Sequence, residues 1–254
     1  MSRNFYKEAA RYYDLLYSDS SANERTIGFI SWAFENYTSK KVSKVLDCAC
    51  GTGAQTMYLL EKEYDITASD YSPDMLEVAR KKIRGKGFTC QTAVNDVRSL
   101  PYNNEFDALI FMFSAFNHLL TTDDARGALA SMKNALVPGG IAVIDIANLV
   151  DLMPRFLKIV NDHSSTGGVR VMRNITHGID SVRSVMTHRE MSIIDDGEGI
   201  KSFAAETELR IFTKPELDML IDSVDFSEVH FFRGYNDRGE KDGNTFRFVY
   251  VLVK

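Results

Sequence analysis

Up to about residue 148, short apolar runs alternate along the chain with segments whose apolar residues recur at helical spacing. The apolar runs cover residues 44–49, 64–70, 88–96, 106–113 and 141–147. The fourth run, FDALIFMF, is apolar almost throughout, which is typical of a strand that is covered on both faces. Strands that alternate with helices predict a parallel, doubly wound sheet. We therefore expect an α/β fold for this part of the chain.

The segments between the apolar runs carry helix signals. We expect helices over residues 54–63 and 123–136, and a third that begins after Ser72 and ends at Gly85 or Gly87. The Ser72 side chain is placed to cap that third helix, and the proline that follows it suits the first helical position. These signals support the alternation of strands and helices.

After about residue 160 the pattern changes. Long strand-like segments cover residues 167–176, 181–194 and 202–212, and the breaks between them read HGID and DDGEG. Such segments with short breaks predict an antiparallel meander rather than another strand–helix–strand unit. The meander, about residues 163–211, would form a roof over the site.

The end of the chain returns to the first pattern. Thr213 and Glu216 form a capping box in front of a predicted helix over residues 213–224. Two further strands are expected over residues 226–235 and 244–254. The meander is therefore expected to be inserted between the fifth strand and this last helix.

Composition and charge narrow the classes of partner. The 254 residues carry a formal net charge of −5, which argues against nucleic acid as the main partner. No apolar run approaches the ~20 residues that a membrane span needs, and the first residues do not resemble a signal peptide. The three cysteines make neither a disulfide framework nor a metal site with the usual ligand spacing. We expect a cytoplasmic protein with no metal and no membrane partner; the sequence leaves the oligomeric state open.

The stretch VLDCACGTG, residues 45–53, places two glycines directly after the first predicted strand. A phosphate-binding P-loop is excluded, because GTGAQT lacks the four-residue spacer and the lysine. The dinucleotide fingerprint fails at its third glycine, where this chain has Thr56. An NAD(P)-dependent oxidoreductase is therefore disfavoured, but it remains an alternative, as does a non-catalytic nucleoside-binding protein.

Acidic residues after the predicted strands suggest the ligand. Asp70 ends the second strand, where a carboxylate can accept both hydroxyls of a ribose, and Asp96 follows the third strand, where an adenine edge would lie. Asp47 lies beside the glycine loop and could face a cationic group. A nucleoside with a positive amine and a carboxylate but no phosphate fits this set. S-adenosylmethionine is such a ligand.

Five motifs occur in the order typical of one enzyme family: VLDCACGTG, ITASDYSPDMLEVAR, VNDVRSLP, FDALIFMFSAFNHL and LVPGGIAVID. Together they resemble the class I S-adenosylmethionine-dependent methyltransferases over about residues 43–148. Within that family the chain is similar to small-molecule N-methyltransferases, namely the glycine N-methyltransferases and the amino-sugar N,N-dimethyltransferases. The resemblance implies a Rossmann-like fold, a small-molecule substrate and methyl transfer. An amine nitrogen is the expected acceptor atom.

The resemblance also implies residue roles. It places Asp47, Gly51 and Gly53 around the methionine part of the cofactor. It places Asp70, Tyr71 and Met75 at the ribose, and Asp96 and Val97 at the adenine. Tyr13 and Phe113 complete the expected cofactor site, and Tyr6 and His118 are the candidate catalytic residues.

One position departs from the family pattern. Glycine N-methyltransferases carry an arginine after the fifth strand that holds the substrate carboxylate, and this chain has Ala147 there. Glycine and sarcosine are therefore in doubt as acceptors.

Four parts are expected along the chain. They are an N-terminal helical lid (1–40), a cofactor-binding Rossmann-like core (41–150), an inserted helix and meander that cap the substrate (151–212), and a return to the core (213–254).

Overall fold

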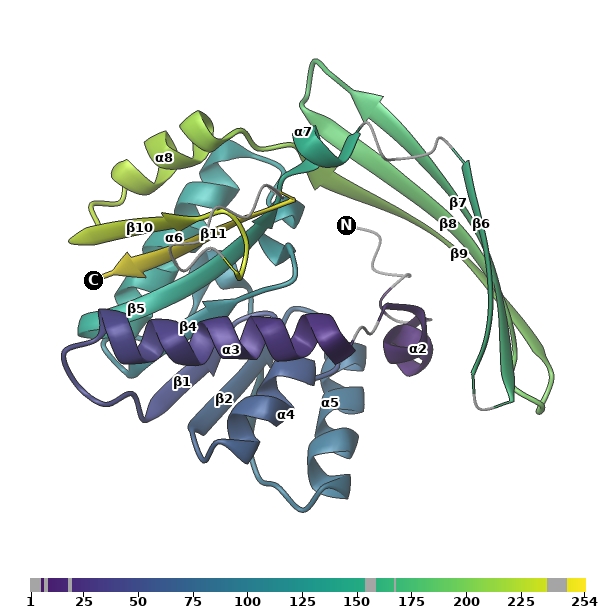
Figure 1. Ribbon diagram of the computed structural model, residues 1–254, viewed down its shortest axis with the longest axis horizontal. Coiled ribbons are helices and arrows are strands. Elements are labelled where there is room, and N and C mark those ends of the chain that lie inside the picture. Colours follow the sequence, from purple (N-terminus) through teal and green to yellow (C-terminus); the bar gives the residue numbers. More distant parts are fainter. Residues whose placement is uncertain (1–5, 7–8, 18–19, 154–158, 167, 237–245) are drawn as a thin grey trace.

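The computed structural model describes residues 6, 9–17, 20–153, 159–166, 168–236 and 246–254. It contains a central sheet covered by helices and a second, antiparallel sheet that stands apart from it (Figure 1). The strands of the central sheet are β1 (Lys44–Asp47), β2 (Asp65–Asp70), β3 (Gln91–Val94), β4 (Phe106–Phe111), β5 (Leu136–Ala147), β10 (Glu228–Phe232) and β11 (Arg247–Val253).

The central sheet has the strand order β10-β11-β5-β4-β1-β2-β3. Strands β1 to β5 pair in parallel, whereas β11 is antiparallel to both of its neighbours. This arrangement confirms the predicted α/β class with a mostly parallel sheet. The order reverses between β1 and β4, and the carboxyl ends of the strands at such a reversal form a ligand crevice.

The helices of the described residues are α2 (Tyr13–Tyr17), α3 (Ser20–Tyr37), α4 (Ala54–Glu61), α5 (Pro73–Gly85), α6 (Thr122–Ala135), α7 (Leu149–Leu152) and α8 (Lys214–Asp222), with 3₁₀ turns η1 (Ala10–Tyr12), η2 (Val97–Ser99) and η3 (Ala115–His118). Two predicted caps are confirmed. Ser72 accepts a hydrogen bond from the Met75 N–H, and Thr213 accepts one from the Glu216 N–H. The Glu216 side chain pairs with Arg210, so only this half of the predicted capping box is observed.

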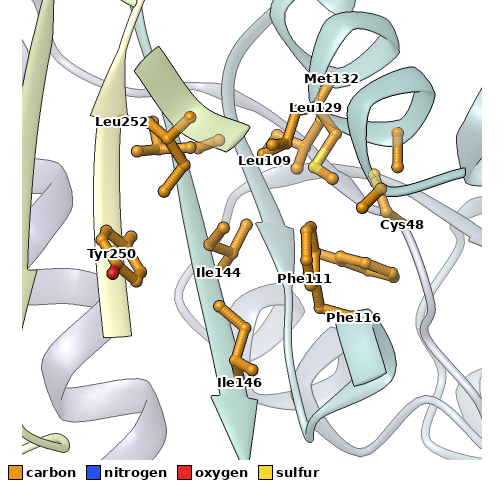
Figure 2. Close-up of a cluster of buried hydrophobic side chains, with 14 of the residues drawn as sticks. Cys48, Leu109, Phe111, Phe116, Leu129, Met132, Ile144, Ile146, Tyr250 and Leu252 are labelled. Carbon is orange, nitrogen blue, oxygen red and sulfur yellow. The ribbon is translucent and has the colours of Figure 1, made fainter. Parts of the chain in front are cut away.

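Alternate residues of the central strands pack on opposite faces of the sheet. Leu109 and Ile144 lie in a cluster with Tyr250 and the buried faces of α6 and α8, part of which Figure 2 shows. Their neighbours Ile110 and Val143 lie in a second cluster with residues of α3, α4 and α5. A sheet buried on both faces needs the continuous apolar strands that the sequence has.

Helix α3 belongs to this core. Phe29 and Ile30 are fully buried, and they pack in the same cluster as Val45 and Val251 of the central sheet. Helix α3, which belongs to the expected lid (residues 1–40), thus packs against the central sheet. Helix α2 lies between the central sheet and the second sheet (Figure 1).

The inserted sheet contains β6 (Ile159–Thr166), β7 (Val169–Asp180), β8 (Val185–Asp195) and β9 (Ile200–Arg210), all antiparallel. We call it the meander. It differs from the sequence prediction in two places. Strand β6 was not predicted, and HGID is the end of β7 rather than a turn. The turn falls at residues 181–184, where the Asp180 carboxylate accepts hydrogen bonds from the Val182 and Arg183 N–H groups.

The inner face of the meander is apolar at both ends. Next to the core, Met186 and Leu209 pack with Ala147 at the end of β5. Farther out, Val171 and Phe203 pack with Leu16 of α2. Because side chains alternate along a strand, residues at even spacing from these share the same face. This face therefore lies opposite the end of the central sheet, with α2 between them (Figure 1).

Asn117 fixes the meander to the core. Its side chain is fully buried, accepts a hydrogen bond from the Ala147 N–H (2.9 Å), and donates to the carbonyl oxygens of Ala147 (3.2 Å) and Arg210 (2.9 Å). One amide thus joins the ends of β5 and β9 to the turn that carries His118.

No helix among the described residues has the length and apolarity of a membrane span.

Candidate functional site

A cavity of about 560 Å³ lies at the carboxyl ends of β1, β2 and β4. This volume falls within the range of about 300–1,000 Å³ that is typical of cofactor and small-molecule sites. Predicted site residues that line it are Tyr6, Tyr13, Gly51, Asp70, Tyr71, Met75, Asp96, Val97, Phe113 and His118. The two other predicted residues, Asp47 and Gly53, do not line it.

The glycine loop needs both glycines, but for different reasons. Both have left-handed backbone, with φ of 56° at Gly51 and 81° at Gly53. A Cβ atom at Gly53 would lie 3.2 Å from the Ala79 Cβ of α5, so this glycine allows two helices to pack closely. Gly51 lines the cavity, and a Cβ atom there would lie 3.5 Å from the end of the Met75 side chain. Of the two glycines of this loop, Gly51 is therefore the one that borders the cavity.

Asp70 closes the second strand at the edge of the cavity. One carboxylate oxygen accepts a hydrogen bond from the Gly51 N–H and the other from the Ser72 N–H, both at 2.8 Å. Burial raises the pKa of this carboxyl, and the backbone hydrogen bonds oppose that shift. Each oxygen keeps a further lone pair for a ligand hydroxyl. The carboxylate is thus held in one orientation at the place expected for a ribose.

Asp47 lies beneath the loop instead of facing the cavity. It is 2% exposed and accepts a hydrogen bond from the Thr56 hydroxyl at 2.7 Å. Burial raises its pKa to about 7. Thr56 is the residue that replaces the third glycine of the dinucleotide fingerprint. Asp47 thus contacts the start of α4 through Thr56 and does not border the cavity.

A charged cluster, of which the sequence predicts only Asp96, also lines the cavity. The Arg98 guanidinium donates to both oxygens of Asp96, at 2.6 to 3.0 Å, and to Asp124 at 2.7 Å. This pairing lowers the pKa of both carboxyl groups. All three side chains line the cavity. Arg98 follows the predicted Asp96 by two residues, but no sequence signal connects it to Asp124 on α6.

The two candidate catalytic residues also line the cavity. The Tyr6 hydroxyl lies 3.2 Å from Nε2 of His118, and their ring centroids are 6.2 Å apart. Burial lowers the pKa of His118 to about 4. Its Nδ1 atom is buried and has no hydrogen-bond partner within the part of the chain that the structure describes. His118 is therefore neutral at physiological pH.

A strained turn places Phe113 in the cavity. Phe113 and Ser114 both have left-handed backbone, with φ of 56° and 62°. The Asp145 carboxylate stabilises the turn. It accepts one hydrogen bond from the Ser114 N–H (2.6 Å) and one from the Arg247 guanidinium (2.8 Å). Left-handed backbone outside glycine is unfavourable and tends to occur at functional sites. The buried Asp145 thus maintains the cavity wall next to His118.

The known proteins that this chain resembles include methyltransferases. Residues 45–140 match the family model of a methyltransferase domain. The glycine/sarcosine N-methyltransferase of Halorhodospira halochloris is 32% identical over 137 residues, which are 53% of this chain and 50% of that protein. The match thus spans half the length of this relative. A Streptomyces venezuelae dTDP-3-amino-3,4,6-trideoxy-alpha-D-glucopyranose N,N-dimethyltransferase is 24% identical over 178 residues, 70% of this chain and 73% of that protein.

Solved structures share the fold. An S-adenosylmethionine-dependent methyltransferase from Clostridium acetobutylicum superimposes with a TM-score of 0.80 over 98% of both chains, at 24% identity. This protein therefore has a Rossmann-like fold, and residues 45–140 match a methyltransferase domain. The resemblance stated from the sequence is confirmed.

Proposed function

We propose that this protein transfers a methyl group from S-adenosylmethionine to an amine nitrogen of a small molecule. The observation that supports it most is that Gly51, Asp70 and Asp96 line the same cavity as the Tyr6–His118 pair. Two of the relatives with matching sequence are named as N-methyltransferases.

The residues of the cavity fit the cofactor. Asp70 would accept the ribose hydroxyls, Asp96 and Val97 would border the adenine, and the open backbone at Gly51 would approach the methionine part. Bound S-adenosylmethionine supplies an activated methyl group, so the protein's task is to bind the cofactor and the acceptor, to align them and to exclude water. Tyr13 and Met75 line the same cavity and would help to exclude water.

The Tyr6–His118 pair would orient the acceptor. A general base acts best when its pKa is close to the working pH, and a buried imidazole with a pKa of about 4 does not meet that condition. A neutral imidazole and a phenol can still exchange hydrogen bonds with an amine. We propose that Tyr6 and His118 align the nitrogen lone pair with the methyl group and do not remove its proton.

The acceptor would lie between this pair and the inner face of the meander. His177, His188 and Thr207 form one cross-strand row on that face, and His177 Nε2 lies 3.1 Å from His188 Nδ1. Thr207 is three residues from Arg210, or roughly 10 Å along the strand from the point where Asn117 joins meander and core. A polar wall at that distance suits a small polar acceptor.

The position opposite Ala147 bears on the acceptor class. In the β5–β11 register, Arg247 faces Ala147, but its guanidinium donates to Asp145 and to the Ser114 hydroxyl (2.9 Å). An arginine that already pairs with a buried carboxylate is a poor partner for a substrate carboxylate. We therefore propose that glycine and sarcosine are not the acceptors.

A screen of acceptors tests the function. The protein is incubated with S-adenosylmethionine and a panel of amines, with hydroxyl compounds and glycine as comparisons, and S-adenosylhomocysteine release is measured. The proposal predicts release with a subset of the amines only. Titration with NADH in parallel tests the oxidoreductase alternative, and binding of NADH in place of S-adenosylhomocysteine would contradict the proposal.

A further inference from the structure

Helix α2 lies between the core and the meander and has a polar contact on each side (Figure 1). On the core side, Asp14 accepts a hydrogen bond from the hydroxyl of Thr52 (2.5 Å) and pairs with Lys82 of α5. Thr52 stands between the two glycines of the loop. The first contact thus ties α2 directly to the glycine loop.

On the meander side, the Tyr17 hydroxyl donates a hydrogen bond to Glu190 of β8. Arg173 of β7 donates to the Leu16 carbonyl oxygen (3.2 Å), and its guanidinium carbon lies 4.6 Å from the centroid of the Tyr17 ring. Leu16 itself packs in the apolar cluster of the outer meander. The last turn of α2 is therefore held by one ion pair on the inner face.

That ion pair is almost completely enclosed. The Glu190 side chain is 1% exposed, and Arg173 donates to both of its oxygens, at 2.9 and 3.0 Å. The Ser192 hydroxyl also donates to Glu190, and His188 Nε2 lies 3.3 Å from it. These contacts lower the pKa of Glu190, so it is charged across the physiological range. A buried charge with this many partners is rigidly placed, and its removal leaves the other groups unsatisfied.

Helix α2 also contributes Tyr13 to the wall of the cavity. The ring of Tyr13 lies 5.0 Å from that of Tyr17 and 6.5 Å from that of Tyr6, centroid to centroid. Tyr6 and Tyr13 line the cavity, and Tyr6 meets His118. A continuous series of contacts therefore runs from the meander to the candidate methyl-transfer position.

We propose that Glu190 is a positioning residue that acts through Tyr17 and α2, so that the meander holds Tyr13 and Tyr6 over the cofactor cavity. Glu190 does not line the cavity itself. The inference rests on the proposed function, because it makes cofactor retention depend on the sheet that faces the acceptor. It implies that acceptor and cofactor sites are coupled through α2 and are not independent halves.

The test compares three variants of the full chain. Tyr17→Phe removes one hydroxyl and leaves the buried ion pair intact. Glu190→Gln removes the charge. Glu206→Gln is the matched control, because Glu206 lies on the neighbouring strand but pairs with Arg189 on the exposed outer face. Backbone amide exchange over residues 13–17 is measured without ligand, and S-adenosylhomocysteine affinity is measured by calorimetry.

Tyr17→Phe and Glu190→Gln should both speed exchange in α2 and weaken S-adenosylhomocysteine binding by about tenfold, as expected for loss of a hydrogen bond to a charged group. Glu206→Gln should change neither. Folded variants with wild-type exchange and affinity would overturn the inference, and so would faster exchange with unchanged affinity. Neither measurement needs methyl transfer, so the two together test the role of Glu190 even if the amine screen fails.

Discussion

Tyr6 and His118, 112 residues apart in the sequence, meet in the wall of the cavity with the phenol oxygen 3.2 Å from the imidazole Nε2. Burial keeps that imidazole neutral by lowering its pKa to about 4. The pair is therefore suited to orienting an acceptor by hydrogen bonds. Two predictions follow from its protonation state.

The first concerns turnover. His118→Asn should retain much of the rate, because an amide can still hydrogen-bond to Tyr6 or to the acceptor. His118→Ala should lower the rate by less than about 10²-fold, below the usual range for loss of an acid–base catalyst. Rate–pH profiles of the wild type and both variants check this. An ionisation near ~6.5 that is present in the wild type and absent in the variants would contradict the orienting role.

The second concerns stability. The unfolded chain has a histidine pKa near ~6.5, so between that value and about 4 the unfolded state binds more protons than the folded state. The free energy of unfolding should therefore fall as the pH drops through this window. His118→Gln should make this fall shallower, as measured by urea denaturation across the window.

The third concerns the ribose position. Asp70→Ala should weaken S-adenosylhomocysteine binding by about 1.5–3 kcal/mol, the contribution of hydrogen bonds to a charged group. The melting temperature should also fall somewhat, because the Gly51 and Ser72 N–H groups lose their acceptor. Asp65→Ala, at the exposed start of the same strand, should change neither quantity. Calorimetric titration of both variants checks this, and an unaltered affinity of Asp70→Ala would remove Asp70 from the site.

The fourth separates the two glycines of the loop. Both alanine variants meet the left-handed backbone penalty of about 1–2 kcal/mol. Gly53→Ala should lower the melting temperature more, because its Cβ would lie 3.2 Å from that of Ala79. Gly51→Ala should lose more affinity per folded molecule, because Gly51 lines the cavity and a methyl group there would meet the ligand. Its effect on packing should be small, because the nearest neighbour is the flexible end of Met75 at 3.5 Å. Thermal melting and affinity measured on the same samples decide between them, and the reverse order would contradict the assignment.

Residues at strand ends could be predicted from the sequence. Gly51, Asp70 and Asp96 each follow a short strand run, and parallel strands bring their carboxyl ends to one edge of the sheet. His118 follows the fourth strand in the same way. Order along the chain was therefore enough to place these residues around one cavity.

Residues whose role depends on packing between helices could not be placed in this way. Gly53 is fixed by its approach to Ala79 of α5, and Asp47 by the hydroxyl of Thr56. The pairing of Arg98 with Asp124 joins η2 to α6 across 26 residues without any periodic signal. Each of these contacts exists only once the helices have docked.

The meander shows the same limit for strands. Residues 161–166, NDHSST, are too polar to be read as a strand, yet β6 pairs with β7 over its whole length. In HGID, the glycine suggested a turn, but Gly178 pairs with Thr187 inside the ladder. Cross-strand pairing overrides local preference at both places.

The central claim is methyl transfer from S-adenosylmethionine to an amine nitrogen. Its most direct test is mass spectrometry of an acceptor identified by the screen, after incubation with S-adenosylmethionine that carries a deuterated methyl group. We predict that the intact labelled methyl group appears on the nitrogen of the product, and that Asp70→Ala protein forms much less of it at limiting cofactor. Label on an oxygen, or no labelled product from any amine while the protein binds the cofactor, would contradict the account.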